Sequence, residues 1–173
     1  MKQIRKSDID FDTFWAIYCQ AFPANERREM AGQQKVMEHE RYAVTLLEHD
    51  GNTVGFITYW DLGSFIFGEH FAVHPDYRGG GIGERCLGRF LSTLSKPFVI
   101  EVELAMDEIS TRRIAFYQRL GIKLNGYDYL QPPYGAGKKP VPMKLMSFPN
   151  LLSQEDFEKA RMIIYRIVYS YPP

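Results

Sequence analysis

Residues 69–94 read EHFAVHPDYRGGGIGERCLGRFLSTL, and this stretch predicts a strand, a tight turn and a helix in succession. Glu69 to Val73 is rich in β-branched and aromatic residues, and Pro75 ends the strand because proline cannot donate a ladder hydrogen bond. Further on, apolar residues recur at helical spacing, which predicts a helix. They are Ile82, Cys86, Leu87, Phe90, Leu91 and Leu94.

Four glycines lie within five residues between this strand and this helix, and Arg78 precedes them. Glycine adopts backbone angles that other residues avoid, and it lets a ligand approach the main chain. The free N–H groups at a helix start, together with the helix dipole, bind anions. We therefore predict a phosphate-binding turn at 78–83; the alternative is a plain glycine-rich turn between a strand and a helix.

Two common phosphate-binding motifs do not fit this turn. A P-loop requires Lys and then Ser or Thr after its last glycine, but Gly88 is followed by Arg89. A dinucleotide fingerprint requires a third glycine, and the two available registers place Glu84 or Cys86 there. The ligand is therefore predicted to be neither a P-loop nucleotide nor a dinucleotide of this type.

The pattern Arg78-x-x-Gly81-x-Gly83 resembles the (Arg/Gln)-x-x-Gly-x-(Gly/Ala) motif of the GNAT-type N-acetyltransferases. That family holds the pyrophosphate of acetyl-CoA at this turn, so the resemblance implies acetyl-CoA as the cosubstrate. The residues that it implies for binding acetyl-CoA here are Arg78, Gly79, Gly80, Gly81, Ile82 and Gly83.

The composition indicates one packed globular domain without a nucleic-acid or membrane partner. The chain has 173 residues, 45% of them hydrophobic and 14% aromatic, and its 21 Lys and Arg balance its 21 Asp and Glu. The N-terminus lacks the apolar run of a signal peptide, and no stretch approaches 18 apolar residues, so we expect a soluble, cytoplasmic protein.

The cysteines and histidines do not predict a metal site. Cys19 and Cys86 have no metal-ligand spacing, and Cys86 lies on the apolar face of its helix, so a buried free thiol is expected. His70 and His74 lack a third ligand at metal spacing, so both are interpreted as structural or surface histidines.

The rest of the chain predicts an α/β fold with a mixed, largely antiparallel sheet flanked by helices. An Asp-Gly pair at 50–51 predicts a tight hairpin, Gly121 a helix C-cap and Ser153 a helix N-cap. The expected elements are a strand 2–6, a helix 11–22 capped by Asp8 or Asp10 and ended by Pro23, a helix 25–39 weakened at Gly32, strands 41–48, 53–62 and 65–73, a helix 82–94, a strand 98–104, a helix 110–120, strands 122–130 and 141–148, and a helix 151–170.

This order resembles the GNAT acyl-CoA acyltransferase fold over residues 1–148: strand, two helices, three antiparallel strands, helix, strand, helix and two strands. The resemblance implies a single acetyltransferase domain, 1–173, with an extra C-terminal helix at 151–170. That helix either covers the core or forms a contact in a homodimer.

The segment 110–122 resembles the family's Asn-x-x-Ala-x-x-(Leu/Phe)-Tyr-x-x-x-Gly-Phe pattern. The resemblance implies that Tyr117 lies near the thioester sulfur and acts as the general acid for the departing thiolate; a phenol with a pKa near 10 is protonated at neutral pH. The alternative is one more aromatic residue on a core face. Ser110, Arg113 and Ile122 depart from the pattern, and the implied contacts with acetyl-CoA are Ser110, Arg113 and Phe116.

The strand before the glycine turn supplies the oxyanion donor in this family. The resemblance places that backbone N–H near Val73 and pairs the neighbouring groups of Phe71 and Ala72 with the pantetheine arm. Two-residue periodicity puts Glu69 on the face of Val73, so Glu69 is a candidate base for the acceptor ammonium. Glu101 and Glu103 on a later strand compete for this role, and any of the three is alternatively a solvated strand position.

The acceptor side has few signals. Glu26, Arg27 and Arg28 could present charge to an acceptor, the arginines to a carboxylate and the glutamate to a polyamine, or they simply form a solvated helix start. Tyr134 lies in a rigid, aromatic loop typical of a pocket rim. The predicted function is direct acetyl transfer from acetyl-CoA to a primary amine of a small molecule. The alternatives are a protein or peptide amine as acceptor, a non-catalytic CoA sensor, and a binding module for another nucleotide.

Overall fold

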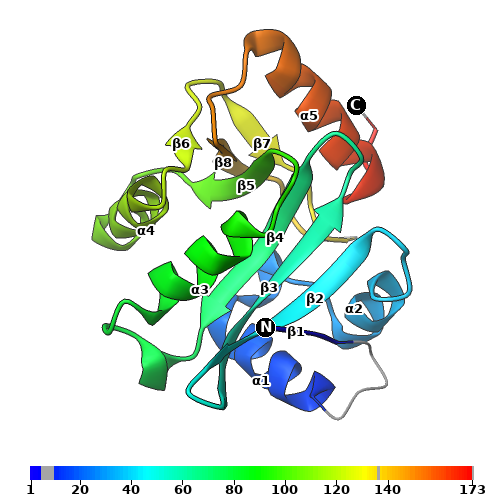
Figure 1. Ribbon diagram of the computed structural model, residues 1–173. Helices are drawn as coiled ribbons and strands as arrows, with labels where there is room; N and C mark the ends of the chain where they lie inside the picture. The colour runs from blue at the N-terminus through cyan, green and yellow to red at the C-terminus, as the bar shows by residue number, and fades with distance from the viewer. Residues whose placement is uncertain (5–9, 136, 173) are drawn as a thin grey trace. The chain divides into compact units, whose positions relative to one another are not determined.

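The computed structural model describes residues 1–4, 10–135 and 137–172 of the chain (Figure 1). Its contacts divide into two compact units. The first unit comprises Met1–Asp61 and Gly68–Ser92, and the second comprises Leu62–Phe67 and Thr93–Pro173. The strand pairs β1–β2, β2–β3, β5–β8, β6–β8 and β7–β8 are antiparallel, which confirms the predicted α/β class with a largely antiparallel sheet.

The first unit is built on strands in the hydrogen-bonding order β1-β2-β3-β4. Asp50 and Gly51 have φ angles of 48° and 77°, so the Asp-Gly pair makes the predicted tight hairpin between β2 and β3. The last two residues of the strand predicted at 2–6 lie outside the described residues. The strands are β1 (Lys2–Ile4), β2 (Tyr42–His49), β3 (Asn52–Asp61) and β4 (Ile66–Val73).

Helices cover both faces of this part of the sheet. The ring of Phe14 on α1 (Phe11–Ala21) lies 4.9 Å from that of Phe56, and the ring of Phe90 on α3 (Ile82–Ser92) lies 5.1 Å from that of Tyr59. Phe56 and Tyr59 are three residues apart on β3, so they point to opposite faces, and α1 and α3 therefore cover opposite faces. Cys86 is buried with a free thiol, as predicted.

The N-terminal helices differ in detail from the sequence predictions. Asp10 is the N-cap of α1, but its side chain makes no capping hydrogen bond, and Asp8 lies outside the described residues. The next helix, α2 (Met30–Val36), begins five residues later than predicted, because a 3-10 turn (Ala24–Glu26) and extended backbone at Glu29 precede it. Gly32 lies within α2 and does not break it.

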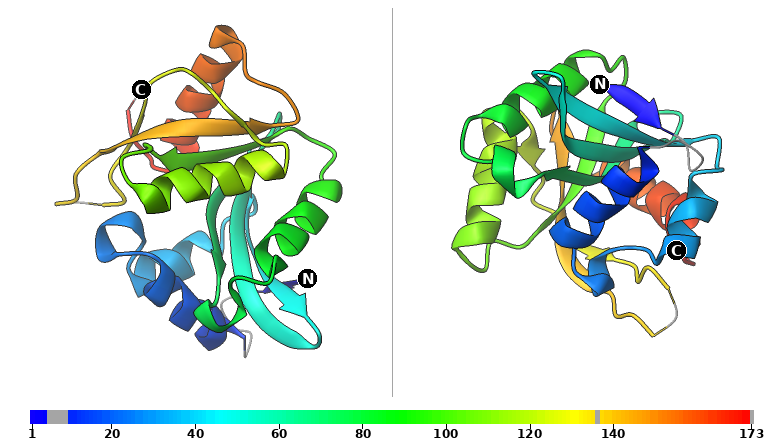
Figure 2. Two further views of the ribbon diagram at one scale, coloured as in Figure 1. Left: turned by 90° about the vertical axis from the view of Figure 1, so that its left-hand side faces the viewer. Right: turned by 90° about the horizontal axis from the view of Figure 1, so that it is seen from below.

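The second unit is built around β8, which pairs with β5, β6 and β7. The helices α4 and α5 lie on opposite faces of the β5–β8 pair (Figure 2). Residues 62–67 also belong to this unit, and the Ile66 N–H at the start of β4 donates to the Pro97 carbonyl at 2.8 Å. The elements are β5 (Phe98–Glu103), α4 (Glu108–Arg119), β6 (Lys123–Leu124), β7 (Tyr129–Gln131), β8 (Val141–Phe148) and α5 (Gln154–Ile167).

The prediction of a single strand at 122–130 is wrong, because the chain at Asn125 leaves the strand conformation and two short strands, β6 and β7, form instead. Asn125 is 1% exposed; its Nδ2 donates to the Leu145 carbonyl at 3.0 Å, and its Oδ1 accepts from the Leu152 N–H at 2.8 Å. Lys144 Nζ donates to the carbonyls of Gly126 and Tyr127. In the stretch of chain between β6 and β7, side-chain hydrogen bonds of Asn125 and Lys144 thus take the place of continuous strand pairing with β8.

The C-terminal helix α5 packs inside the second unit. Ser153 Oγ accepts from the Asp156 N–H at 3.1 Å, which confirms Ser153 as the N-cap. Phe157 and Ile164 are buried, and the Phe157 ring lies 4.8 Å from that of Tyr127. The helix therefore covers core of its own unit, while the homodimer contact and the single-domain organisation stay predictions.

We expect Gly55→Ala to destabilise the protein, because β3 and β4 approach closely at Gly55. A Cβ at this position would lie 2.2 Å from the Ala72 carbonyl oxygen. Overpacking against backbone should lower the free energy of unfolding by about 2 kcal/mol or more, measured by urea denaturation. The matched control Gly126→Ala has no heavy atom within 4 Å of its Cβ and should change stability much less. Equal effects of the two substitutions would contradict the prediction.

Candidate active site

The glycine turn in the first unit is held in an open conformation. It follows a 3-10 turn (Pro75–Tyr77). Gly79 and Gly81 have φ angles of 89° and 70°, which residues with a Cβ atom rarely adopt. A Cβ at Gly80 would have no heavy atom within 4 Å. Arg85 secures the turn, because its Nη1 donates to the Gly80 carbonyl at 2.9 Å. No side chain therefore lies against Gly79 or Gly80, while the Arg85 guanidinium lies beside Gly81 at the start of α3.

Arg78 links the glycine turn to the end of β4. Its Nε donates to the Val73 carbonyl at 2.9 Å, and the residue is otherwise exposed. The guanidinium charge therefore lies at the turn beside the positive end of the α3 dipole. A diphosphate is the kind of anion that this combination of charge and backbone N–H groups stabilises.

The end of β4 lies close to β3. Ala72 is buried, while Phe71 and Val73 are half-buried. The His74 N–H donates to the Val54 carbonyl at 2.9 Å, and the Ala72 carbonyl faces Gly55. These residues form a well-defined strand end, and the oxyanion donor near Val73 stays a prediction.

Glu69 and Arg28, which the sequence predicted for two different roles, form one buried ion pair. Arg28 Nη2 lies 2.7 Å from Glu69 Oε1, and the Glu69 side chain is fully buried. Burial alone would raise the pKa of Glu69, but the Arg28 guanidinium and the His70 ring, whose Nδ1 lies 3.7 Å from Glu69 Oε2, lower it to about 2. A carboxylate with so low a pKa is a poor proton acceptor at neutral pH, which disfavours Glu69 as the base.

Other buried polar residues surround this pair, and together we name them the Arg28–Glu69 cluster. The Tyr18 hydroxyl accepts from the Arg28 backbone N–H at 3.1 Å, and Gln33 Nε2 donates to the Tyr42 hydroxyl at 2.9 Å. Burial raises the pKa of both tyrosines, so both hydroxyls stay protonated. The sequence did not indicate this role of the two tyrosines, because Tyr18 is expected on the apolar face of a helix and Tyr42 in a strand. The cluster is Tyr18, Arg28, Gln33, Tyr42, Thr58, Glu69 and His70.

Glu26 and Arg27, which precede Arg28, contact other residues of the first unit. Arg27 Nε donates to the Phe22 carbonyl at 3.2 Å, and its guanidinium lies 5.6 Å from the Trp15 ring centre. The Glu26 carbonyl lies 3.0 Å from His70 Nε2. Both residues are half-buried, and their predicted contact with an acceptor stays a prediction.

Tyr117 lies on α4 in the second unit and is 5% exposed. Burial raises the pKa of its hydroxyl to about 12, an effect that Arg113 opposes and Glu103 reinforces. The hydroxyl is therefore protonated throughout the neutral range, as a proton donor must be. The Phe116 ring lies 5.2 Å from the Tyr117 ring.

The departures from the family pattern on α4 have structural partners. Ser110 forms a capping box with Asp107: its N–H donates to Asp107 Oδ1 at 2.7 Å, and its hydroxyl donates to the same oxygen. Arg113 forms an ion pair with Glu103 on β5. The predicted contacts of Ser110 and Arg113 with acetyl-CoA stay predictions, and in the structure each side chain has a partner within the second unit.

Glu101, on β5, lies in a polar and aromatic environment that sequence reasoning did not detect. Its carboxylate accepts from Tyr129 Oη, from Gln131 Nε2 at 2.5 Å and from Tyr169 Oη at 2.7 Å. Tyr169 Oη also lies 3.3 Å from Tyr134 Oη. The only advance signal was the density of tyrosines after residue 126; their convergence on one carboxylate depends on the fold.

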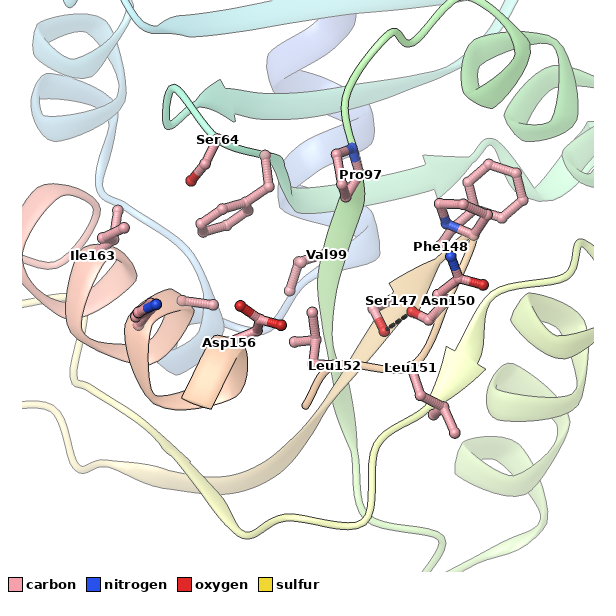
Figure 3. Close-up of a pocket in the computed structure, with 14 residues that line it drawn as sticks. Ser64, Pro97, Val99, Ser147, Phe148, Asn150, Leu151, Leu152, Asp156 and Ile163 are labelled. Carbon is pink, nitrogen blue, oxygen red and sulfur yellow. Dashed lines mark hydrogen bonds between the residues drawn. The ribbon is translucent and has the colours of Figure 1, made fainter. Parts of the chain in front are cut away.

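A pocket of about 490 Å³ lies elsewhere in the second unit. Figure 3 shows Pro97, Val99, Leu152 and Ile163 among its lining residues. Ser147 Oγ, also in the lining, donates to the Asn150 carbonyl at 2.7 Å. None of the residues predicted for acetyl-CoA, catalysis or acceptor lines this pocket.

Within residues 1–4, 10–135 and 137–172, no group of three or more His, Cys, Asp or Glu side chains is arranged to hold a metal ion. Over the same part of the chain, every helix is too short or too polar to cross a membrane.

Comparison with known proteins relates this chain to acetyltransferases. The model of the acetyltransferase (GNAT) family matches residues 11–122. A structure named as a GNAT-family acetyltransferase of Bacteroides thetaiotaomicron is 36% identical, with a TM-score of 0.94 over 99% of this chain and 100% of that one. YjbC of Bacillus subtilis (strain 168), named as an acetyltransferase, is 25% identical over 87% of this chain and 78% of its own. The structure of yncA from Salmonella typhimurium with acetyl-CoA shares the fold, with a TM-score of 0.60 at 17% identity over 88% of this chain and 96% of that one.

We expect Glu69→Gln to destabilise the protein in a pH-dependent way. Removing the carboxylate charge leaves the Arg28 guanidinium buried without it, which should lower the free energy of unfolding at pH 7 by about 3–5 kcal/mol. The pKa of Glu69 is lowered from 4.5 to about 2 by folding, so its stabilising contribution is present above pH 4.5 and is lost as the pH falls toward 2.

The measurement is urea denaturation of both proteins between pH 7 and pH 3. The difference between them should shrink below pH 4.5. The control Glu155→Gln removes a carboxylate whose side chain is 77% exposed and paired with Lys159, and it should change stability by less than about 0.5 kcal/mol. A difference between wild type and Glu69→Gln that stays constant down to pH 3 would refute the assigned role.

Proposed function

Because the chain belongs to the acetyltransferase (GNAT) family, we propose that it transfers the acetyl group of acetyl-CoA directly to a primary amine of a small molecule. Membership of the family makes the chain an N-acetyltransferase with acetyl-CoA as its cosubstrate. The acceptor and the roles of individual residues are the content of the proposal. The observation that carries it is the open glycine turn at the start of α3, with Arg78 beside it.

The glycine turn fits the pyrophosphate of acetyl-CoA. Gly79 and Gly81 adopt their positive φ angles without strain because glycine has no side chain. The open space beside Gly80 lets a phosphate oxygen approach the main chain. The first N–H groups of α3 have no partners within the helix and are available as donors. Arg78 adds a charged donor. A related structure with bound acetyl-CoA, that of yncA, has the same fold.

The transfer forms one C–N bond and breaks one C–S bond. The amine nitrogen attacks the thioester carbonyl, the oxyanion is stabilised by the backbone N–H near Val73, and collapse releases the CoA thiolate. We assign Tyr117 as the hydrogen-bond and proton donor to that thiolate; the proton that the nitrogen loses as the amide forms passes through water to the Tyr117 phenolate and restores its hydroxyl. With a pKa of about 12 its hydroxyl is always protonated, but it is a weaker acid than an ordinary phenol, so its contribution should be moderate.

The acceptor ammonium must lose a proton before it attacks. Glu69, the sequence candidate for this step, has its charge committed to Arg28 and a pKa of about 2. We therefore propose that water carries this proton away, and that Glu69 positions β4 through its pairing with Arg28. Glu26 and Arg27 are proposed to border the acceptor, as their place beside the Arg28–Glu69 cluster allows.

The donor site is tested by calorimetric titration with acetyl-CoA. We expect wild-type protein to bind in the micromolar range and Arg78→Ala to bind at least about tenfold more weakly, because a charged hydrogen-bond donor is lost. Gly81→Glu should abolish binding, since it places a side chain at a φ of 70° and a negative charge at the turn. Lys159→Ala, which removes an exposed cation from α5, is the matched control. Absence of binding to the wild-type protein would overturn the donor site.

The proposed role of Tyr117 is tested by Tyr117→Phe, which keeps the ring and removes the hydroxyl. We expect kcat to fall by about 10- to 100-fold while the affinity for acetyl-CoA stays within twofold. CoA release is measured with a panel of small primary amines and of peptides with free N-termini. An unchanged kcat would exclude Tyr117 as the donor, turnover of peptides alone would favour a peptide acceptor, and acetyl-CoA binding without turnover of any amine would favour a sensor.

A further inference from the structure

We propose that a pocket beside α5 in the second unit binds a small organic cation that has an apolar body. We name it the α5 pocket. Its volume is about 490 Å³, which lies within the range of about 300–1,000 Å³ that is typical of small-molecule sites. All of its lining residues fall within 62–67 and 93–173, so the pocket is formed by the second unit alone. The inference is independent of the proposed acetyl transfer.

The wall of the α5 pocket is largely apolar. Phe65, just before β4, Val99 on β5 and Ala160 on α5 are buried residues of this wall. Leu152 and Ile163 are half-buried and complete it (Figure 3). An apolar group that enters the pocket leaves water, and the gain in free energy is roughly proportional to the apolar area that it buries. The wall therefore favours a ligand with a ring or a branched hydrocarbon chain.

Hydrogen bonds hold two sides of this wall in place. The Ile66 N–H donates to the Pro97 carbonyl at 2.8 Å, which fixes Phe65 next to the start of β5. The hydroxyl of Ser147, a buried lining residue on β8, donates to the Asn150 carbonyl at 2.7 Å and secures the chain between β8 and α5. Because these contacts lie within the protein, the pocket is formed before a ligand binds, and binding does not have to order its wall.

The first turn of α5 places charge at the pocket. Asp156 and Lys159 are the charged side chains among the described residues that line it. The Asp156 Oδ2 atom accepts from the Ser153 hydroxyl at 2.7 Å, which orients the carboxylate. Figure 3 shows Asp156 pointing from the start of α5 toward the pocket. A carboxylate therefore lies next to the apolar wall.

Lys159 does not cancel the charge of Asp156, because it is shared. Its Nζ lies 2.6 Å from Glu155 Oε1, and the raised pKa of Lys159 is due mainly to Glu155 and to a smaller extent to Asp156. One ammonium thus serves two carboxylates. On the next turn, Glu158 and Arg161 balance each other, with an Nη2–Oε2 distance of 2.7 Å. The beginning of α5 therefore carries a net negative charge, which a cationic ligand complements and an anionic ligand opposes.

The apolar wall sets most of the affinity of the pocket, and the charge sets its preference. Asp156 is exposed, so water and salt screen its charge, and an exposed ion pair changes affinity by up to about fivefold. The ligand that fits both features has one ring or branched chain and one ammonium group.

The test is titration of the full chain, without acetyl-CoA, followed by NMR chemical-shift changes. The probes are benzylammonium, benzyl alcohol and phenylacetate, which share a benzyl group and carry a positive, a neutral and a negative polar end. We expect benzylammonium to bind with a Kd of about 1 mM or below, benzyl alcohol about three- to fivefold more weakly, and phenylacetate more weakly still. The shifts should fall on lining residues, Val99, Ala160 and Ile163 among them. The advantage of benzylammonium over benzyl alcohol should shrink in about 1 M salt.

Asp156→Asn keeps the shape of the side chain and removes its charge. We expect it to weaken benzylammonium binding about three- to fivefold, to the level of benzyl alcohol, and to leave benzyl alcohol binding within about twofold. The matched control is Asp12→Asn, because Asp12 is also an exposed aspartate in the first turn of a helix, α1, and belongs to the first unit. It should leave the affinity for all three probes unchanged. Ile163→Phe, which fills part of the pocket from a half-buried position, should weaken benzylammonium and benzyl alcohol alike.

The inference is wrong if none of the three probes shifts the resonances of the lining, or if phenylacetate binds as tightly as benzylammonium. An unchanged affinity of Asp156→Asn for benzylammonium would likewise exclude the assigned charge preference. Lining resonances that move with protein concentration and not with benzylammonium would show that a second copy of the chain covers the pocket, and this too would overturn the proposal.

Discussion

The buried ion pair between Arg28 and Glu69 is the contact on which the first unit depends. Two charges removed from water are costly unless each lies against its partner, and Arg28 Nη2 lies 2.7 Å from Glu69 Oε1. Glu69 brings β4 to this pair, the Tyr18 hydroxyl on α1 accepts from the backbone N–H of Arg28, and Gln33 on α2 donates to the neighbouring Tyr42 hydroxyl. The end of β4 and the glycine turn follow directly along the chain. The pair therefore fixes the strand that leads into the glycine turn proposed to bind acetyl-CoA.

The environments of three glutamates show how identical carboxylates acquire different roles. Glu69 is fully buried against an arginine, which makes it a structural anion with a pKa too low for a base. Glu103 is partly exposed and paired with Arg113, so it stabilises the packing of α4 on β5. Glu101 accepts hydrogen bonds from Tyr129, Gln131 and Tyr169, which orient its carboxylate among tyrosines. Alternation along a strand cannot separate these cases, because the partner residues are distant in sequence.

Features governed by local rules could be predicted from the sequence. The Asp-Gly hairpin, the Ser153 cap and the bounds of β8 follow from neighbouring residues, and the open glycine turn follows from its glycines. The late start of α2 and the interruption between β6 and β7 could not be predicted. The second depends on Asn125 reaching Leu145 and Leu152, more than 19 residues away, and that partnership exists only in the folded chain.

Glu101 lies within the part of the chain that matches the family, but the residues that surround its carboxylate lie beyond that part. The family match spans residues 11–122 and contains the glycine turn, Glu101 and Tyr117. The residues around the Glu101 carboxylate all lie beyond residue 122; they are Tyr129, Gln131, Tyr134 and Tyr169. Tyr169 directly follows α5 and its C-cap. A helix outside the matched region thus delivers a hydroxyl to a strand carboxylate inside it.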